Sequence, residues 1–183
     1  MAKFEIVSRF ANPEYPEDAI HLPVRATKNA AGYDFAAAES YVIVPYASVM
    51  EQLAMGEGTG FLDRYSLDDV ANLTKKKTAR PALIATGIKV KLADDEYLEI
   101  SARSSLPLKH WLVVANGVGI IDADYYNNPS NEGEIFFQLI NLSPFYIEIH
   151  KGDFIGQGII KKYYKTEDDA ADAERTGGFG STH

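Results

Sequence analysis

Two carboxylates lie close together near the middle of the chain. Asp122 and Asp124 end the segment 116–125 (NGVGIIDADY), which is apolar up to the first of them. In an extended chain, residues i and i+2 share a face, so both carboxylates can enter one site. A carboxylate placed there can act as a general base toward water. The alternative is that both aspartates cap a β-turn.

A second group of residues joins a guanidinium to hydroxyls. Arg103 is followed by Ser104 and Ser105, directly after a predicted strand at residues 97–101. The planar guanidinium of arginine matches the oxygens of a phosphate, and neighbouring hydroxyls add further hydrogen bonds. This group indicates a phosphate contact, and its alternative is an ordinary strand end with surface hydroxyls.

The last nine residues, 175–183 (RTGGFGSTH), combine glycines with one cation, one aromatic ring and two adjacent hydroxyls. Glycines let the backbone approach a ligand closely, Arg175 suits phosphate oxygens, and Phe179 suits a flat ring. A nucleotide satisfies all of these groups at once. The tail is therefore expected to be a flexible flap, although Gly-rich termini are also often simply disordered.

A metal site built from histidine or cysteine is not expected. The sequence has no cysteine, and its histidines are too scattered to have metal-ligand spacing. They are His21, His110, His150 and His183. Any metal should be Mg²⁺ carried by ligand phosphates and water, with carboxylates in outer positions.

Short strands are predicted for most of the chain, because alternating apolar residues recur between Gly, Pro, Asn and Asp. Several of these segments are enriched in β-branched and aromatic residues. The predicted strands are residues 41–44, 83–92, 97–101, 111–115, 134–142 and 145–149. A chain of 183 residues fits one domain, here residues 1–183, and many short strands indicate an all-β sandwich or barrel.

Two segments depart from the β pattern. Residues 46–80 are predicted to be a helical insertion, with a capping-box-like Ser66 and Asp69, that covers the barrel or meets a protein partner. From residue 161 the composition turns charged and poor in apolar residues. Residues 161–183 are therefore expected to form a C-terminal arm and flap with the reach to act on a neighbouring subunit.

Charge and composition limit the partners. The net charge of −8 argues against binding to long nucleic acid, which calls for a basic face. No apolar run approaches the length of about 20 residues that a membrane span needs. The absence of cysteines and of a visible secretory signal favours a cytoplasmic protein.

Five segments, in order along the chain, resemble the motifs of the trimeric dUTPases. They are residues 31–35 (AGYDF), 103–106 (RSSL), 116–125, 152–157 (GDFIGQ) and 175–182. The resemblance implies a jelly-roll-like β-barrel that forms a homotrimer with active sites shared between subunits. It also implies hydrolysis of dUTP to dUMP and pyrophosphate with Mg²⁺ on the triphosphate. That reaction limits uracil in DNA and supplies dUMP for dTMP synthesis.

The resemblance also implies roles for residues of the third motif. Asp122 would be the base that activates water for attack on the α-phosphorus, and Asp124 would be structural. Tyr125 would lie under the deoxyribose, where a 2′-hydroxyl has no room. Asn116 and neighbouring backbone groups, with Gly119 among the contacts, would recognise uracil.

The other motifs would bind phosphates, the metal and the base. Arg103, Ser104 and Ser105 would contact phosphates, as would Gln157. Asp34 and Gln157 would reach Mg²⁺ only through waters. In the tail, Phe179 would stack on uracil and Arg175 would meet the γ-phosphate, and further contacts would come from Gly180, Ser181 and Thr182.

The sequence departs from the family pattern in several places. Ala102 replaces the usual proline and Ser105 a common glycine, while residues 127–132 form an extra loop. Phe154 replaces the usual arginine, which removes a cation. The spacing between Arg175 and the following glycines is one residue shorter than usual.

Two other readings stay open. The related dCTP deaminases share the jelly-roll trimer but act on the base, and release of ammonia from dCTP would identify that activity. A regulatory protein that binds a partner through residues 46–80 is the second. An inactive binding module is disfavoured by the intact set of Asp122, Arg103, Gln157 and Phe179.

Overall fold

The computed structural model describes residues 1–12, 14–15, 19–48, 81–173, 175 and 177. Residues 46–48 are helical, and the rest of the predicted insertion at 46–80 lies outside the described residues. The tail residues Phe179, Gly180, Ser181 and Thr182 also lie outside them.

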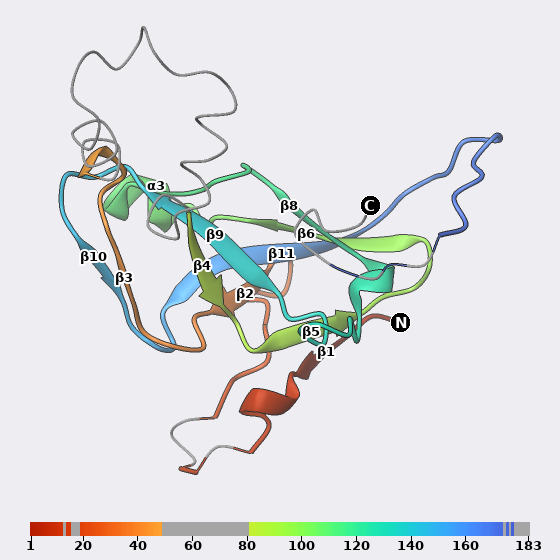
Figure 1. Ribbon diagram of the computed structural model, residues 1–183, viewed down its shortest axis with the longest axis horizontal. Helices are drawn as coiled ribbons and strands as arrows, with labels where there is room; N and C mark the ends of the chain where they lie inside the picture. The colour runs from red at the N-terminus through yellow and green to blue at the C-terminus, as the bar shows by residue number, and fades with distance from the viewer. Residues whose placement is uncertain (13, 16–18, 49–80, 174, 176, 178–183) are drawn as a thin grey trace, which may run out of the picture.

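The described part is built mainly of short antiparallel strands (Figure 1). The first five are β1 (Lys3–Ile6), β2 (Tyr33–Ala36), β3 (Tyr41–Ile43), β4 (Ala82–Ala85) and β5 (Ile88–Lys91). The others are β6 (Glu96–Ser101), β7 (Leu112–Val114), β8 (Gly119–Asp122), β9 (Phe136–Asn141), β10 (Ile147–Ile149) and β11 (Phe154–Lys162). One short helix, α3 (Ser105–His110), and the 3-10 turns η1 (Ser8–Phe10) and η4 (Ala123–Tyr125) join them.

The strands form four antiparallel sheets. A four-stranded sheet has the order β2-β11-β6-β8 and a three-stranded sheet the order β4-β9-β7, while β1 pairs with β5 and β10 with β3. The core includes Phe35, Ile84, Leu98 and Phe137, whose side chains are fully buried. The predicted all-β, jelly-roll-like fold is confirmed. The strands of the described part do not close into a barrel, because their pairing stops at the edges of these separate sheets.

The strand predicted at residues 83–92 is in fact two strands in different sheets. β4 pairs with β9, whereas β5 pairs with β1. Between them the chain turns at Gly87, whose φ of 69° is a left-handed conformation that favours glycine. The Thr86 hydroxyl donates to the Ile135 carbonyl over 2.7 Å, and the Gly87 N–H donates to the Glu134 carboxylate over 3.0 Å. These bonds give the polar groups of the turn hydrogen-bond partners at the point where the pairing of β4 with β9 ends.

Other elements escaped the sequence prediction. β11 was not foreseen, because Gly156 and Gly158 lie inside it and glycine in a strand usually indicates an interruption. It runs to Lys162, so residues 161 and 162, which were assigned to the predicted arm, belong to the strand. The helix α3, with six residues, is too short to show a helical period.

Candidate active site

A hollow of about 220 Å³ lies between the four-stranded and three-stranded sheets. Its walls come from β6 and β8 on one side and from β7 and β9 on the other, with Tyr125 and Arg175 completing it. The lining residues are Ile100, Val114, Asn116, Gly119, Ile120, Ile121, Asp122, Tyr125, Phe136, Gln138 and Arg175. The structure thus brings together five residues predicted separately from the third motif and the tail.

The third motif is a tight connection between two sheets. After β7 the chain turns through Gly117, whose N–H donates to the Val114 carbonyl over 2.9 Å, and β8 then begins at Gly119. Asp122 ends β8, and the 3-10 turn Ala123–Tyr125 directs the Tyr125 side chain inward, where it is buried. Asp122 precedes this turn without making a side-chain capping bond, so the turn-capping alternative does not hold for it.

Arg175 makes contacts that the sequence did not predict. Its Nη2 bonds the Asp122 carboxylate, and its Nε donates to Asp124 Oδ1 over 2.7 Å. The guanidinium carbon also lies 5.9 Å from the centre of the Tyr125 ring. The side chain of Asp122 is 49% exposed, so water can still reach it. The predicted contact of Arg175 with a γ-phosphate stays a prediction.

A second cluster forms around Arg103. Its Nε lies 3.2 Å from Asp34 Oδ1, and its guanidinium carbon lies 4.7 Å from the centre of the Phe154 ring. Asp34 is the register partner of Gln157 where β2 pairs with β11. Phe154 therefore does more than remove a cation, because its ring packs against the remaining one. Ser104 is exposed just before α3 begins at Ser105.

The two clusters lie toward opposite ends of β6. Asp122 pairs with Tyr97 near one end, and Gln157 pairs with Ser101 at the other. Four residues of extended strand separate these positions, a distance of about 13 Å at roughly 3.3 Å per residue. In one chain, the predicted base and the predicted phosphate ligands are therefore held apart.

The extra loop reaches the hollow through the Tyr125 hydroxyl. Asn131 Nδ2 donates to it over 2.6 Å. Burial raises the pKa of the Tyr125 phenol above its usual value, so the phenol stays neutral and needs a hydrogen-bond partner. Sequence analysis identified the loop and the tyrosine but not their link, because nothing in their spacing shows which loop residue turns back.

Asp34 and Gln157, the predicted metal contacts, are paired across β2 and β11. One carboxylate and the Gln157 amide supply oxygens, which Mg²⁺ accepts as ligands. Within the described ranges, no group of three or more His, Cys, Asp or Glu residues is placed to hold a metal ion. The predicted water-mediated contact of Asp34 and Gln157 with Mg²⁺ stays a prediction. A membrane-spanning helix is also absent from the described residues, since none of their helices is long and apolar enough to cross a membrane.

Known proteins resemble this chain along most of its length. The dUTPase family model matches residues 63–183. The deoxyuridine 5′-triphosphate nucleotidohydrolase of Lactococcus lactis is 35% identical over 181 residues, which cover 98% of this chain and 95% of that protein. The corresponding Rickettsia conorii protein is 43% identical over 111 residues, covering 58% of this chain and 71% of the relative.

Solved structures agree in fold. The dUTPase of Streptococcus mutans matches with a TM-score of 0.65 and 30% identity, over 90% of this chain and 98% of that one. A dUTPase from phage phi11 of Staphylococcus aureus, described as coordinating a structural Mg(II) ion, matches with a TM-score of 0.59 over 94% of this chain and 97% of that one. Its identity of 17% supports the fold alone. From the family model and the Lactococcus relative together, the chain belongs to the dUTPase family.

Proposed function

We propose that this protein is a dUTP diphosphatase, which hydrolyses dUTP to dUMP and pyrophosphate. The proposal is carried by the match to the Lactococcus nucleotidohydrolase over 98% of this chain. The activity would remove dUTP from the nucleotide pool and supply dUMP for dTMP synthesis. The cytoplasm, where that pool is held, is the location this activity implies.

Asp122 is the proposed general base. It lines the hollow, and its half-exposed carboxylate can accept a proton from water. The water oxygen would bond to the α-phosphorus as the bond from that phosphorus to the bridging oxygen breaks, which releases pyrophosphate. Arg175 occupies one Asp122 oxygen in this structure. A phosphate that attracts Arg175 would free that oxygen for the water.

Arg103 is the proposed phosphate ligand, with Ser104, Ser105 and Gln157 beside it. Asp34 engages Nε of Arg103. The terminal nitrogens of the guanidinium would be the donors to phosphate oxygens. Mg²⁺ on the triphosphate would neutralise its charge, with Asp34 and Gln157 near it through waters. The protein's own task is then to position the phosphates and complement their charge.

Asn116, Gly119 and Tyr125 are proposed to hold the nucleoside. All three line the hollow, whose remaining walls include the apolar side chains of Ile100 and Val114. A tight slot would reject thymine by a clash with its methyl group. Such a clash is needed because the loss of a favourable methyl contact changes the binding free energy by only about 1 to 3 kcal/mol. The roles of Phe179, Gly180, Ser181 and Thr182 in closing over the nucleotide stay predictions.

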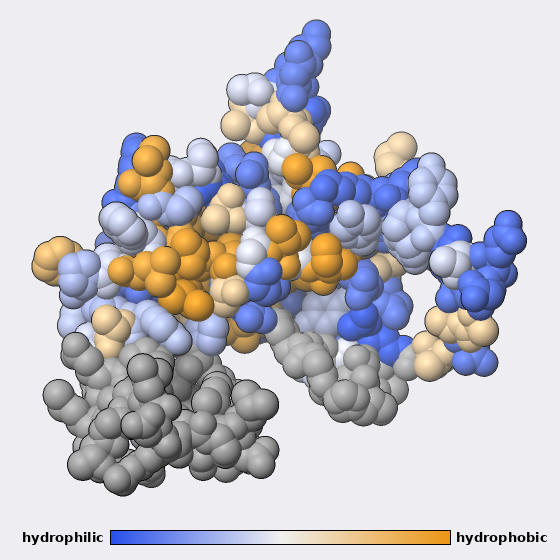
Figure 2. Space-filling model, turned by 90° about the horizontal axis from the view of Figure 1, so that it is seen from above, coloured by the Kyte–Doolittle hydropathy of each residue, from blue (hydrophilic) through white to orange (hydrophobic). Residues whose placement is uncertain are grey.

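A homotrimer with shared sites is part of the proposal. The separation of the Asp122 and Arg103 clusters along β6 supports it, because a neighbouring subunit can supply the cluster that one chain holds apart. Figure 2 shows a broad hydrophobic band across one face of the molecule, as expected of a surface that meets another chain. The predicted protein partner at residues 46–80 stays a prediction.

The decisive experiment measures pyrophosphate release from dUTP, dTTP, dCTP and UTP. We expect turnover of dUTP far above the others and a loss of about 10²- to 10⁴-fold in kcat for Asp122→Asn. The matched control is Glu148→Gln, which neutralises an exposed carboxylate on β10 and should leave turnover unchanged. Undiminished hydrolysis by Asp122→Asn would refute the assigned base. Release of ammonia from dCTP would identify a deaminase instead.

A further inference from the structure

The Tyr125 ring is fixed at both of its ends. At the backbone end, η4 follows β8 directly and places the side chain in the hollow, where the residue is 6% exposed. At the other end, Asn131 Nδ2 donates to the hydroxyl over 2.6 Å. The ring is therefore held at Cβ by the backbone and at Oη by a hydrogen bond.

The loop that carries Asn131 closes tightly on Tyr125. The Asn128 N–H donates to the Tyr125 carbonyl over 3.1 Å, and the Gly133 N–H donates to Asn131 Oδ1 over the same distance. Gly133 has a φ of 77°, and a Cβ there would lie 2.2 Å from the Tyr125 carbonyl oxygen. Only glycine lets the chain return this close. Both ends of the Asn131 amide are therefore used, one for the loop and one for the ring.

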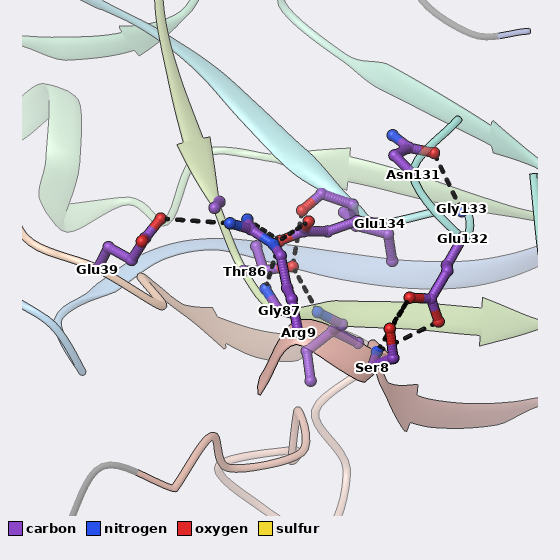
Figure 3. A network of polar contacts seen from close by, with 12 residues as sticks. Ser8, Arg9, Glu39, Thr86, Gly87, Asn131, Glu132, Gly133 and Glu134 are labelled. Atoms are coloured by element: carbon purple, nitrogen blue, oxygen red, sulfur yellow. Dashed lines mark hydrogen bonds and ion pairs between the residues drawn. The ribbon is translucent and has the colours of Figure 1, made fainter. Parts of the chain in front are cut away.

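Contacts with the distant segments η1 and β5 hold the loop from outside. The Glu132 carboxylate accepts hydrogen bonds from the backbone N–H and the hydroxyl of Ser8 (Figure 3). Lys89 Nζ donates to Asn127 Oδ1 over 2.7 Å. Next to the loop, Arg9 pairs with the buried Glu134 through two bonds of 3.0 and 2.8 Å. The loop is thus held against η1 and β5, which restrains the backbone that carries Asn131.

We propose that Asn131 is a positioning residue that fixes the Tyr125 ring and thereby sets the discrimination between 2′-deoxyribose and ribose triphosphates. The inference rests on the proposed function, in which this ring lies under the sugar. A 2′-hydroxyl is excluded only while the ring cannot yield. Releasing the hydroxyl end lets the ring move by the distance that the extra oxygen needs.

The test compares kcat/KM for dUTP and UTP in four variants. Asn131→Leu removes the donor at similar size, and Tyr125→Phe removes only the acceptor. Each should raise the UTP-to-dUTP ratio of kcat/KM about three- to tenfold, as expected for one neutral hydrogen bond. Asn131→Leu also removes the acceptor of the Gly133 N–H. The double variant should raise the ratio no further than Asn131→Leu alone, because the bond that Tyr125→Phe removes is then already absent. Asn131→Asp should restore the wild-type ratio, since its carboxylate can accept from both Gly133 N–H and the phenol.

The matched control is Ser130→Ala. Its hydroxyl bonds Asn128 within the same loop, so the change should leave the ratio unaltered. A folded Asn131→Leu variant, checked by circular dichroism, that keeps the wild-type ratio would overturn the proposal. Additive effects in the double variant would overturn it as well.

A second measurement separates this inference from the proposed function. Ring-flip rates of Tyr125, measured by NMR in the protein without ligand, should rise in Asn131→Leu but not in Ser130→Ala. Unchanged flip rates would refute the positioning role even if the wild type hydrolysed dUTP. Faster flips in a protein with no dUTP turnover would leave the anchoring in place and reject the proposed function.

Discussion

The Asp122 carboxylate is in contact with a guanidinium in this structure. Arg175 reaches it from the tail and also bonds Asp124, so one guanidinium links two carboxylates of the third motif. The Arg175 side chain is 21% exposed and that of Asp122 49%, so solvent reaches the pair. A solvent-accessible pair contributes little to stability and can be exchanged for a phosphate. In the proposed mechanism, Arg175 would leave Asp122 for a phosphate of the substrate.

Phe154 gives a test of how Arg103 is held. Phe154→Leu removes the ring that lies 4.7 Å from the guanidinium, and a cation–π contact at an exposed site is worth about 0.5 to 1 kcal/mol. We expect KM for dUTP to rise about two- to fivefold with kcat nearly unchanged. Steady-state kinetics check this.

Phe154→Tyr is the matched control, because it keeps an aromatic face and should keep KM. A leucine variant with the wild-type KM would show that Asp34 alone positions Arg103.

Residues close in sequence were predictable as a site, and pairs far apart were not. Asn116, Asp122 and Tyr125 lie within ten residues, and an extended segment followed by a turn brings them to one hollow. The pairs Arg103–Phe154 and Asn131–Tyr125 depend on strand register and loop geometry. No pattern in the sequence encodes either of these directly.

At the scale of elements, the same limit explains the split of the strand predicted at residues 83–92. Alternation continues across Gly87, so the period alone cannot show that the chain leaves one sheet for another. The passage from one sheet to the other depends on Glu134 and Ile135, a distant segment that accepts hydrogen bonds from the turn. β11 shows the reverse case, where two glycines concealed a nine-residue strand.

The loop turn at Gly133 can be tested by stability. Gly133→Ala places a Cβ 2.2 Å from the Tyr125 carbonyl oxygen at a φ of 77°. Such backbone strain costs on the order of 1 to 3 kcal/mol, which chemical denaturation measures as a lower free energy of unfolding.

Gly152→Ala is the matched control, with a φ of 88° and no atom within 4 Å of the added Cβ. It should lose only the cost of the left-handed backbone, about 1 to 2 kcal/mol, and so less than Gly133→Ala. Equal losses at both positions would contradict the proposed close contact.

The contact between Glu132 and Ser8 predicts that the free energy of unfolding depends on pH. The hydrogen bond from the Ser8 hydroxyl lowers the pKa of Glu132 below its ordinary value of 4.5. A lowered carboxyl pKa stabilises the fold above the ordinary value, and the stabilisation is lost as the pH falls through the folded value. The free energy of unfolding of the wild type should therefore exceed that of Glu132→Gln at neutral pH.

This difference should shrink below pH 4.5, as measured by urea denaturation across a pH series. A difference that stayed constant from neutral to acid pH would show that the Glu132 charge does not anchor the loop.

At the scale of the whole molecule, the shared-site proposal predicts complementation. Asp122→Asn and Arg103→Ala should each be nearly inactive alone. If a site takes Asp122 from one chain and Arg103 from another, unfolding and refolding the two variants together restores some sites. At equal amounts, random trimers would regain about a quarter of the wild-type sites.

Pyrophosphate release from the refolded mixture measures this recovery, and light scattering checks for trimers. Asp122→Asn refolded alone is the control. A mixture no more active than its parts would place both residues of each site on one chain.

β6 pairs with β11 on one side and with β8 on the other, and so sets the distance between the Asp122 and Arg103 clusters. In the proposed trimer, each copy of this strand would serve two active sites instead of one. A single faulty subunit would then disable two of the three sites of its assembly, so equal amounts of faulty and intact chains would leave about a quarter of the sites intact. Where two versions of the chain are expressed together, a defective β6 would therefore lower activity by more than its share of the chains.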